Sequence, residues 1–208
     1  MQKLLKLVES LKKTNVRVIV DSRIREFKEL GRKSNTELFK ELCFCILTAN
    51  YSAERGIEIQ KKMGNGFLTL PEKQLARRLK ELGHRYPNNR AAYIVYGRKH
   101  KDSLGKVLSS FGSETEKREW LTKEVKGIGC KEASHFLRNT GCDDCAIIDF
   151  HIIDVLARHG LLKKPKTLTK KGYFEIEKLL KKLAQKTGLT LAELDLYLWY
   201  METGKILK

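Results

Sequence analysis

The residues best suited to covalent chemistry lie in one segment, residues 121–154, which reads LTKEVKGIGCKEASHFLRNTGCDDCAIIDFHIID. Lys131 follows a Gly-x-Gly turn, and Asp149 stands 18 residues further on, after the apolar residues 146–148. A lysine amine attacks carbon only when it is neutral, so its pKa must fall from about 10.4. Burial, neighbouring cations and a helix N-terminus all lower that pKa. Lys131 and Asp149 together therefore predict nucleophilic catalysis by Lys131. The alternative is that Lys131 is an ordinary solvated lysine at a helix start.

The turn before this lysine has the composition of an anion-binding hairpin. Gly127 and Gly129 flank Ile128, and glycine lets the backbone turn tightly and approach a phosphate closely. A helix should start at about Cys130, with its first amides unsatisfied and its positive dipole end exposed. An ordinary turn between two helices is the alternative, because Gly-x-Gly is common. Asp149 is expected to begin the next helix as its cap.

The order and spacing of VKGIGCKEAS followed by AIIDFH resemble the helix-hairpin-helix signature of the base-excision DNA glycosylase superfamily. In that superfamily, a lysine just after the hairpin marks bifunctional enzymes. They remove a damaged base through a Schiff base and then cut the strand by β-elimination. Lys131 falls on that position, and Asp149 falls on the invariant aspartate, whose family role is to stabilise the oxocarbenium-like sugar. One departure is Val125-Lys126, which stands where the pattern usually has Gly or Pro.

Three further stretches resemble the compact 8-oxoguanine DNA glycosylases of archaea and some bacteria, so that the resemblance covers most of the chain. They are LTANYSAERG near residue 50, NNRAAYIV near residue 90 and the ending LYLWYMETGKILK. The resemblance implies that the flipped base lies between Tyr86 and Trp199, with the terminal carboxylate of Lys208 closing the pocket. Without it, Trp199 would be interpreted as a core residue and Lys208 as a frayed end. His151 is either a proton carrier or a packed helix residue.

The overall charge favours a polyanionic partner. The 208 residues include 42 Lys and Arg against 25 Asp and Glu, a formal net charge of +17. Such an excess suits a nucleic acid that releases counterions on binding, although a heat-adapted surface is an alternative explanation. Six basic residues are candidates to line the phosphate path: Arg85, Arg90, Arg98, Lys99, Lys123 and Lys126. The 41% share of hydrophobic residues excludes disorder for most of the chain.

Membrane and metal functions are not expected. No apolar run approaches the roughly 18 residues that span a bilayer, and residues 1–13 lack the apolar block of a signal peptide. We therefore expect a cytoplasmic, nucleoid-associated monomer. The five cysteines include one C-x-x-C, Cys142 to Cys145, which falls short of four metal ligands. Free thiols and no cofactor are expected, and the resemblance adds a monovalent cation at the hairpin carbonyls as an option.

The elements that must position these residues are helices. Apolar residues recur at helical spacing, only three prolines occur and no alternating strand pattern is evident, so the fold class is all-α. Helix starts are predicted at Thr36, Ser52, Pro71, the Ser113–Glu116 cluster and a Thr190–Glu193 capping box. The last of these helices would carry Trp199. The run Val-Arg-Val-Ile-Val at residues 16–20 has strand composition and weakly suggests a short β-hairpin.

These elements predict two helical lobes with an active-site cleft between them. The central lobe spans residues 38–143 and carries the hairpin, and the second lobe combines residues 1–37 and 144–208. The expected function is a bifunctional glycosylase and AP lyase acting on double-stranded DNA that contains 8-oxoguanine. One alternative is an oxidised-pyrimidine enzyme of endonuclease III type without the iron–sulfur cluster. Another is a helix-hairpin-helix DNA-binding module without chemistry, which would need neither Lys131 nor Asp149.

Overall fold

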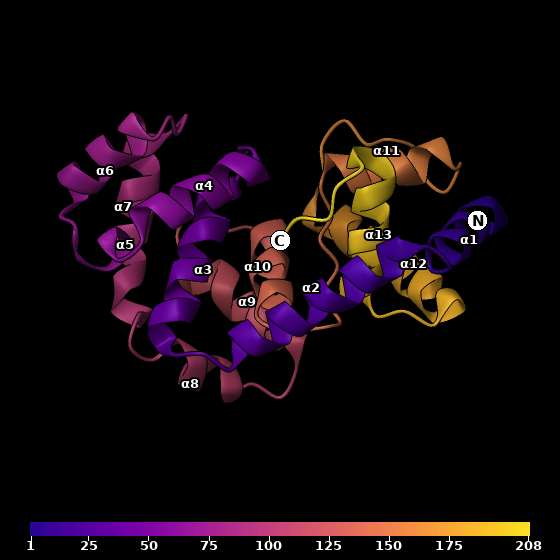
Figure 1. Cartoon of the computed structure of the whole chain (residues 1–208), viewed down its shortest axis with the longest axis horizontal. Helices are drawn as coiled ribbons and strands as arrows, with labels where there is room; N and C mark the ends of the chain where they lie inside the picture. The colour runs from indigo at the N-terminus through magenta and orange to yellow at the C-terminus, as the bar shows by residue number, and fades with distance from the viewer.

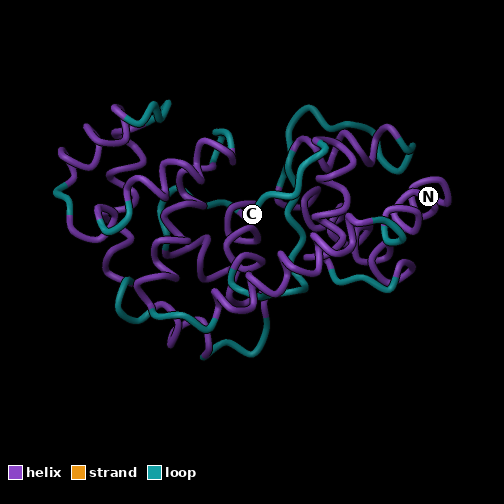
Figure 2. Tube along the Cα trace, in the orientation of Figure 1, coloured by secondary structure: helices purple, strands orange, loops and turns teal.

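The computed structural model describes all 208 residues as helices and connecting turns, with no strand (Figure 2). The prediction of an all-α protein is confirmed. In chain order, the helices shown in Figure 1 are α1 (Gln2–Leu11), α2 (Asn15–Gly31), α3 (Asn35–Thr48), α4 (Ala53–Met63), α5 (Gly66–Thr69), α6 (Glu72–Glu81), α7 (Pro87–Gly97), the 3-10 helix η1 (Arg98–His100), α8 (Leu104–Ser109), α9 (Glu114–Glu124), α10 (Cys130–Asn139), α11 (Phe150–Arg158), α12 (Lys170–Thr187) and α13 (Leu191–Thr203).

Most of the helix starts follow from local capping. The Ser52 hydroxyl accepts a hydrogen bond from the backbone amide of Arg55, and Pro71 immediately precedes α6. Complete capping boxes start α9 and α13, formed by Ser113 with Glu116 and by Thr190 with Glu193. In each box the side chain and backbone of the two residues satisfy each other's exposed polar groups. These predicted starts are confirmed.

Two local predictions are wrong. Helix α3 begins at Asn35, with Ser34 at the N-cap position and no capping hydrogen bond from its side chain, so Thr36 lies inside the first turn. Residues 16–20 belong to α2 and form no hairpin. Val16 and Val20 are buried one helical turn apart, whereas Val18 between them is 61% exposed. Burying one helical face against the rest of the protein outweighs the weak β-preference of valine and isoleucine.

The buried side chains form two hydrophobic clusters. The first contains residues between Leu38 and Cys145, including Phe39, Phe44 and Phe136. The second combines both chain ends, with residues 4–27 packed against residues 146–198. Figure 1 shows α3 to α10 gathered on one side and α1 with α11 to α13 on the other, while α2 runs along both. The residue boundaries assigned to the two lobes stay a prediction.

Two buried ion pairs join these clusters. Arg118 on α9 pairs with Glu177 on α12, and Arg138 on α10 pairs with Asp195 on α13. The chain end makes a third connection, because the segment after α13 crosses back toward α3 and α4 (Figure 1). No helix is long and apolar enough to cross a bilayer.

Candidate active site

Residues from both sides of the fold line one cavity of about 630 Å³. Its walls come from the end of α3 and the turn into α4, one face of α10, the start of α11, the inner face of α13 and the C-terminal segment. Small-molecule pockets typically measure about 300–1,000 Å³, so the cavity has room for a nucleobase. Five of the residues that the sequence singled out line it: Lys131, Asp149, His151, Trp199 and Lys208.

Lys131 reaches the cavity from the first turn of α10, directly behind the glycine turn. Its side chain is a quarter exposed, and its Nζ lies 3.7 Å from Glu132 Oε1. Glu132 also accepts a hydrogen bond from the backbone amide of Gly129 at 3.2 Å. The lysine is therefore accessible from the cavity, next to a carboxylate that is itself fixed to the hairpin.

The hairpin depends on its glycines and on one apolar anchor. Gly127 has a φ of +81°, and a Cβ there would lie 2.2 Å from the Tyr93 ring. Both the left-handed backbone and the contact exclude larger residues. Ile128 is buried in the first cluster, so its side chain anchors the turn and only its backbone is left for a ligand. Since Glu132 occupies the Gly129 amide, phosphate binding by residues 127–129 stays a prediction.

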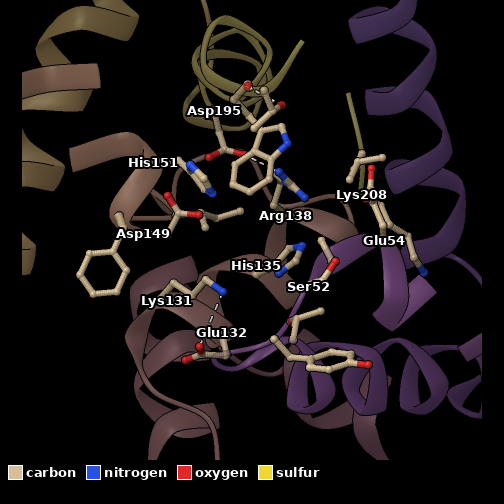
Figure 3. A pocket seen from close by; sticks show the side chains of 18 of the residues that line it. Ser52, Glu54, Lys131, Glu132, His135, Arg138, Asp149, His151, Asp195 and Lys208 are labelled. Carbon is tan, nitrogen blue, oxygen red and sulfur yellow. Dashed lines mark hydrogen bonds and ion pairs between the residues drawn. The ribbon is translucent and has the colours of Figure 1, made fainter. Parts of the chain in front are cut away.

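Asp149 enters the cavity from the other side, as the cap of α11. Its Oδ1 accepts a hydrogen bond from the backbone amide of Ile152 at 3.0 Å, which confirms the predicted cap. Its second oxygen makes no hydrogen bond within the protein and is available to a ligand. Figure 3 shows the Lys131 amine and the Asp149 carboxylate directed into the same space from two different elements.

Aromatic side chains form part of the wall around this space. Trp199 lines the cavity, and its indole N–H is buried without a hydrogen-bond partner. Phe150, directly after Asp149, also lines the cavity although its side chain is 69% exposed. Aromatic side chains in the wall of a cavity fit a flat ligand such as a nucleobase. The sequence alone predicts no role for Phe150.

Tyr86 is the one predicted base-binding residue that does not line the cavity. It caps α7, and the guanidinium groups of Arg85 and Arg90 lie 5.2 and 5.8 Å from its ring centre. Its backbone amide donates to His84, whose ring stacks on that of Tyr51 at 4.2 Å. Tyr51, not Tyr86, is the tyrosine that lines the cavity. Tyr86 therefore does not share the cavity wall with Trp199, and its stacking role stays a prediction.

The chain end is held in place by its last side chain. Lys208 Nζ lies 2.7 Å from Glu41 Oε2, also contacts Gln60 Oε1, and sits 4.3 Å over the ring of Phe44. Leu207 and Lys208 both line the cavity. These contacts hold the Lys208 side chain at the cavity, and the closing of the pocket by the terminal carboxylate stays a prediction.

Burial perturbs two ionisable groups of the cavity. The pKa of His135 is lowered well below its usual value by burial and by the nearby Arg138 and Lys131, so the imidazole is neutral. Burial raises the pKa of the Asp195 carboxyl to about 6, although Arg138 is paired with it. Sequence reasoning missed these groups because helix residues of such types are usually solvated, and no local pattern marks them.

Four of the six candidate phosphate contacts divide into two groups. Arg90 and Arg98 are used inside the protein, where they donate to the backbone carbonyls of Ala49, Phe67 and Leu70. Lys99 and Lys126 are different, because their amines flank the exposed ring of Tyr96 at 4.6 and 4.3 Å, beside the hairpin. This second group is accessible to a phosphate backbone.

A two-lobed helical protein with a lysine behind a hairpin, facing an aspartate cap across a cavity, has the arrangement of a helix-hairpin-helix DNA glycosylase. The chain belongs to the 8-oxoguanine DNA glycosylase family, whose model matches residues 20–189. It is 52% identical to an 8-oxoguanine DNA glycosylase/AP lyase of Methanocaldococcus jannaschii and 53% identical to one of Korarchaeum cryptofilum. The alignments cover 99% of both chains in the first comparison, and 97% of this chain and 96% of the relative in the second.

Solved structures agree with this assignment. The Methanocaldococcus jannaschii 8-oxoguanine glycosylase/lyase in complex with a 15mer DNA containing 8-oxoguanine superposes with a TM-score of 0.96, covering 99% of this chain and all of that chain. The 8-oxoguanine DNA glycosylase of Thermotoga maritima, at 46% identity, gives a TM-score of 0.93 and covers 100% of this chain and 99% of its own. Both likenesses extend over the whole fold, beyond the hairpin motif.

Proposed function

We propose that the protein excises 8-oxoguanine from duplex DNA and then cleaves the strand as an AP lyase in base excision repair. The observation that carries this proposal is the convergence of Lys131 and Asp149 on one cavity from two different helices. A DNA-binding module without chemistry has no need of a nucleophile and a carboxylate around an enclosed space. The names of the relatives, which are similar over nearly their whole length, support the same activity.

The proposed reaction begins when the damaged nucleotide leaves the helix stack and enters the cavity. The neutral amine of Lys131 attacks C1′, the bond from C1′ to the base breaks, and its electron pair leaves with the base. Asp149 is placed to stabilise the positive charge that develops on the sugar. Loss of the amine proton and opening of the sugar ring give a Schiff base between Lys131 and C1′. Loss of a C2′ proton then expels the 3′ phosphate, which breaks the strand.

Base recognition is assigned to the wall opposite the nucleophile. The ring of Trp199 offers a stacking face, and the terminal carboxylate of Lys208 can accept hydrogen bonds from the guanine edge. Family resemblance alone supports Tyr86 as a second residue that stacks on the base. The reaction as written needs no cofactor, and we propose that a monomer performs it.

Borohydride trapping tests this function directly, because the reagent reduces a Schiff base to a stable protein–DNA adduct. Duplexes carrying 8-oxoguanine or an oxidised pyrimidine would be incubated with the native protein and with Lys131→Gln. We expect an adduct on the 8-oxoguanine duplex with the native protein and none with the variant. Lys73→Gln, which removes an exposed positive charge from α6, is the matched control and should still be trapped.

Each other outcome changes the assignment in a defined way. An adduct only on the pyrimidine duplex would retain the lysine mechanism and replace the substrate. Normal trapping by Lys131→Gln would exclude Lys131 as the nucleophile. DNA binding without an adduct on either duplex would favour the module without chemistry.

A further inference from the structure

A buried carboxylate holds the last side chain of the protein. Glu41 lies on α3 among apolar neighbours and is only 2% exposed. Its Oε2 pairs with Lys208 Nζ at 2.7 Å. A chain end normally frays. Burying a charged pair also removes both charges from water, so the contact is unfavourable unless hydrogen bonds satisfy the buried carboxylate.

That geometry is satisfied by side chains from two other helices, α10 and α4. Glu41 Oε1 accepts a hydrogen bond from Asn139 Nδ2 at 2.6 Å, and Oε2 accepts one from Gln60 Nε2 at 3.0 Å. Gln60 is fixed in turn, because the same amide donates to the backbone carbonyl of Lys40 at 3.0 Å. The carboxylate is thus a fixed receptor for the Lys208 amine.

The network continues to the opposite wall of the cavity. Asn139 Oδ1 accepts hydrogen bonds from the guanidinium of Arg138, at 3.1 Å from Nε and 2.9 Å from Nη2, and that guanidinium pairs with Asp195 on α13. Arg138, Asp195 and Lys208 all line the cavity, whereas Glu41 and Asn139 lie behind it. A chain of polar contacts therefore links the C-terminus to the helix that carries Trp199.

We propose that Glu41 is a positioning residue, which holds the Lys208 side chain so that the terminal carboxylate faces the base-binding cavity. This inference rests on the proposed function for its effect on catalysis. The contact with Glu41 itself does not depend on that function. Glu41 acts through Lys208 and does not touch the substrate, so its loss should affect recognition of the base and spare the chemistry of Lys131.

Two substrates separate these effects. An 8-oxoguanine duplex requires the base to be bound, whereas a duplex with an abasic site requires only the Lys131 lyase reaction. In Glu41→Gln, we expect kcat/KM for 8-oxoguanine excision to fall at least about tenfold while abasic-site cleavage stays within about twofold of native. Lys208→Met keeps the terminal carboxylate but removes the amine, so it should show the same selective loss.

The double variant and a matched control make the assignment specific. If Glu41 acts through Lys208, the double variant Glu41→Gln/Lys208→Met should lose little more than either single variant. Glu37→Gln removes an exposed ion pair with Lys40 one turn earlier on α3 and should leave both activities unchanged. Thermal unfolding of every variant reports any general loss of structure. A fall in both activities that follows lower stability would make Glu41 merely structural and overturn the proposal.

A measurement without DNA tests the contact even if the proposed function fails. Carboxypeptidase B removes a C-terminal lysine only when the chain end is accessible. Intact mass over time should show slow removal of Lys208 from the native protein and removal at least about tenfold faster from Glu41→Gln. An equal rate in the two proteins, or unchanged excision by Glu41→Gln, would overturn the inference. A native protein that is inactive on both duplexes would instead defeat the proposed function, with the digestion still deciding whether Glu41 holds the terminus.

Discussion

The rings of Trp199 and His151 meet edge to face, with their centres 4.7 Å apart and their planes at 81°. Both side chains line the cavity of Lys131. His151 follows the Asp149 cap by two residues, so this contact links the indole on α13 to the helix that begins after the Asp149 carboxylate. The edge-to-face contact gives His151 a packing role, and a role in proton transfer stays a prediction.

Replacing Trp199 should separate base binding from strand cleavage. Trp199→Ala removes a stacking face, which contributes about 1–3 kcal/mol per base, so excision of 8-oxoguanine should slow by roughly 5- to 150-fold. Trp199→Tyr should retain more activity because it keeps an aromatic ring. Single-turnover assays on 8-oxoguanine and abasic duplexes would measure both steps. Equal losses on the two substrates would show that Trp199 supports the fold of the cavity and does not bind the base.

Local signals explain which parts of the fold the sequence could predict. The capping boxes at Ser113 and Thr190 are formed within four residues, so they can be identified without the tertiary structure. The run at residues 16–20 shows the opposite case. Its valines and isoleucine favour strands by composition, but Val16 and Val20 pack one face of α2 into the second core. Composition over five residues carries no information about that tertiary packing.

The same distinction applies to the site. Lys131 and Asp149 can be predicted as site residues because they belong to one continuous sequence motif. The Glu41–Asn139 hydrogen bond joins residues 98 positions apart, and the Arg138–Asp195 pair joins residues 57 apart. Neither contact has a spacing rule that a single sequence could reveal. The family resemblance predicts that Tyr86 binds the base, whereas the structure places Tyr51 in the cavity wall.

Two substitutions at Asp149 should distinguish its cap from its charge. Asp149→Asn keeps an oxygen that can accept from the Ile152 amide, so stability should change by less than about 0.5 kcal/mol. Loss of the negative charge should lower turnover by about 100-fold or more while DNA binding is retained. Asp149→Ala should lose the cap as well, at about 1 kcal/mol of stability. Denaturant unfolding, DNA binding and turnover would be compared, and weaker DNA binding by the Asn variant would contradict an electrostatic role in catalysis.

Breaking the buried ion pair between α9 and α12 should destabilise the whole protein. Arg118 Nη1 and Nη2 lie 2.5 and 2.9 Å from the two carboxylate oxygens of Glu177, and both side chains are at most 8% exposed. Glu177→Gln leaves a buried guanidinium without its counter-charge, which typically costs about 3–5 kcal/mol. The free energy of unfolding in urea would show this loss.

Two controls make that measurement specific. Adding Arg118→Met to Glu177→Gln removes the unpaired charge and keeps an oxygen for the Ala146 amide, so part of the stability should return. Glu81→Gln breaks an exposed pair with Arg78 and should cost less than about 1 kcal/mol. Similar losses for the buried and the exposed pair would contradict the proposed importance of burial.

The neutral imidazole of His135 should make stability depend on pH. Burial, with Arg138, Lys131 and Lys208 nearby, lowers its pKa in the folded protein, whereas in the unfolded chain it titrates near 6.5. Below pH 6.5 the unfolded chain therefore binds a proton that the folded protein excludes, and the free energy of unfolding falls as the pH is lowered. Between pH 7.5 and 5.5 this single group should cost about 1 kcal/mol.

His135→Gln removes the titrating group and isolates this effect from that of other histidines. The pKa values of His84 and His100 are also lowered by burial, so both proteins should lose stability in acid, but the variant should lose about 1 kcal/mol less. Urea unfolding at several pH values between 7.5 and 5.5 would measure the two slopes. Identical slopes would mean that His135 has the same pKa in the folded and the unfolded protein, so that burial does not keep its imidazole neutral in acid.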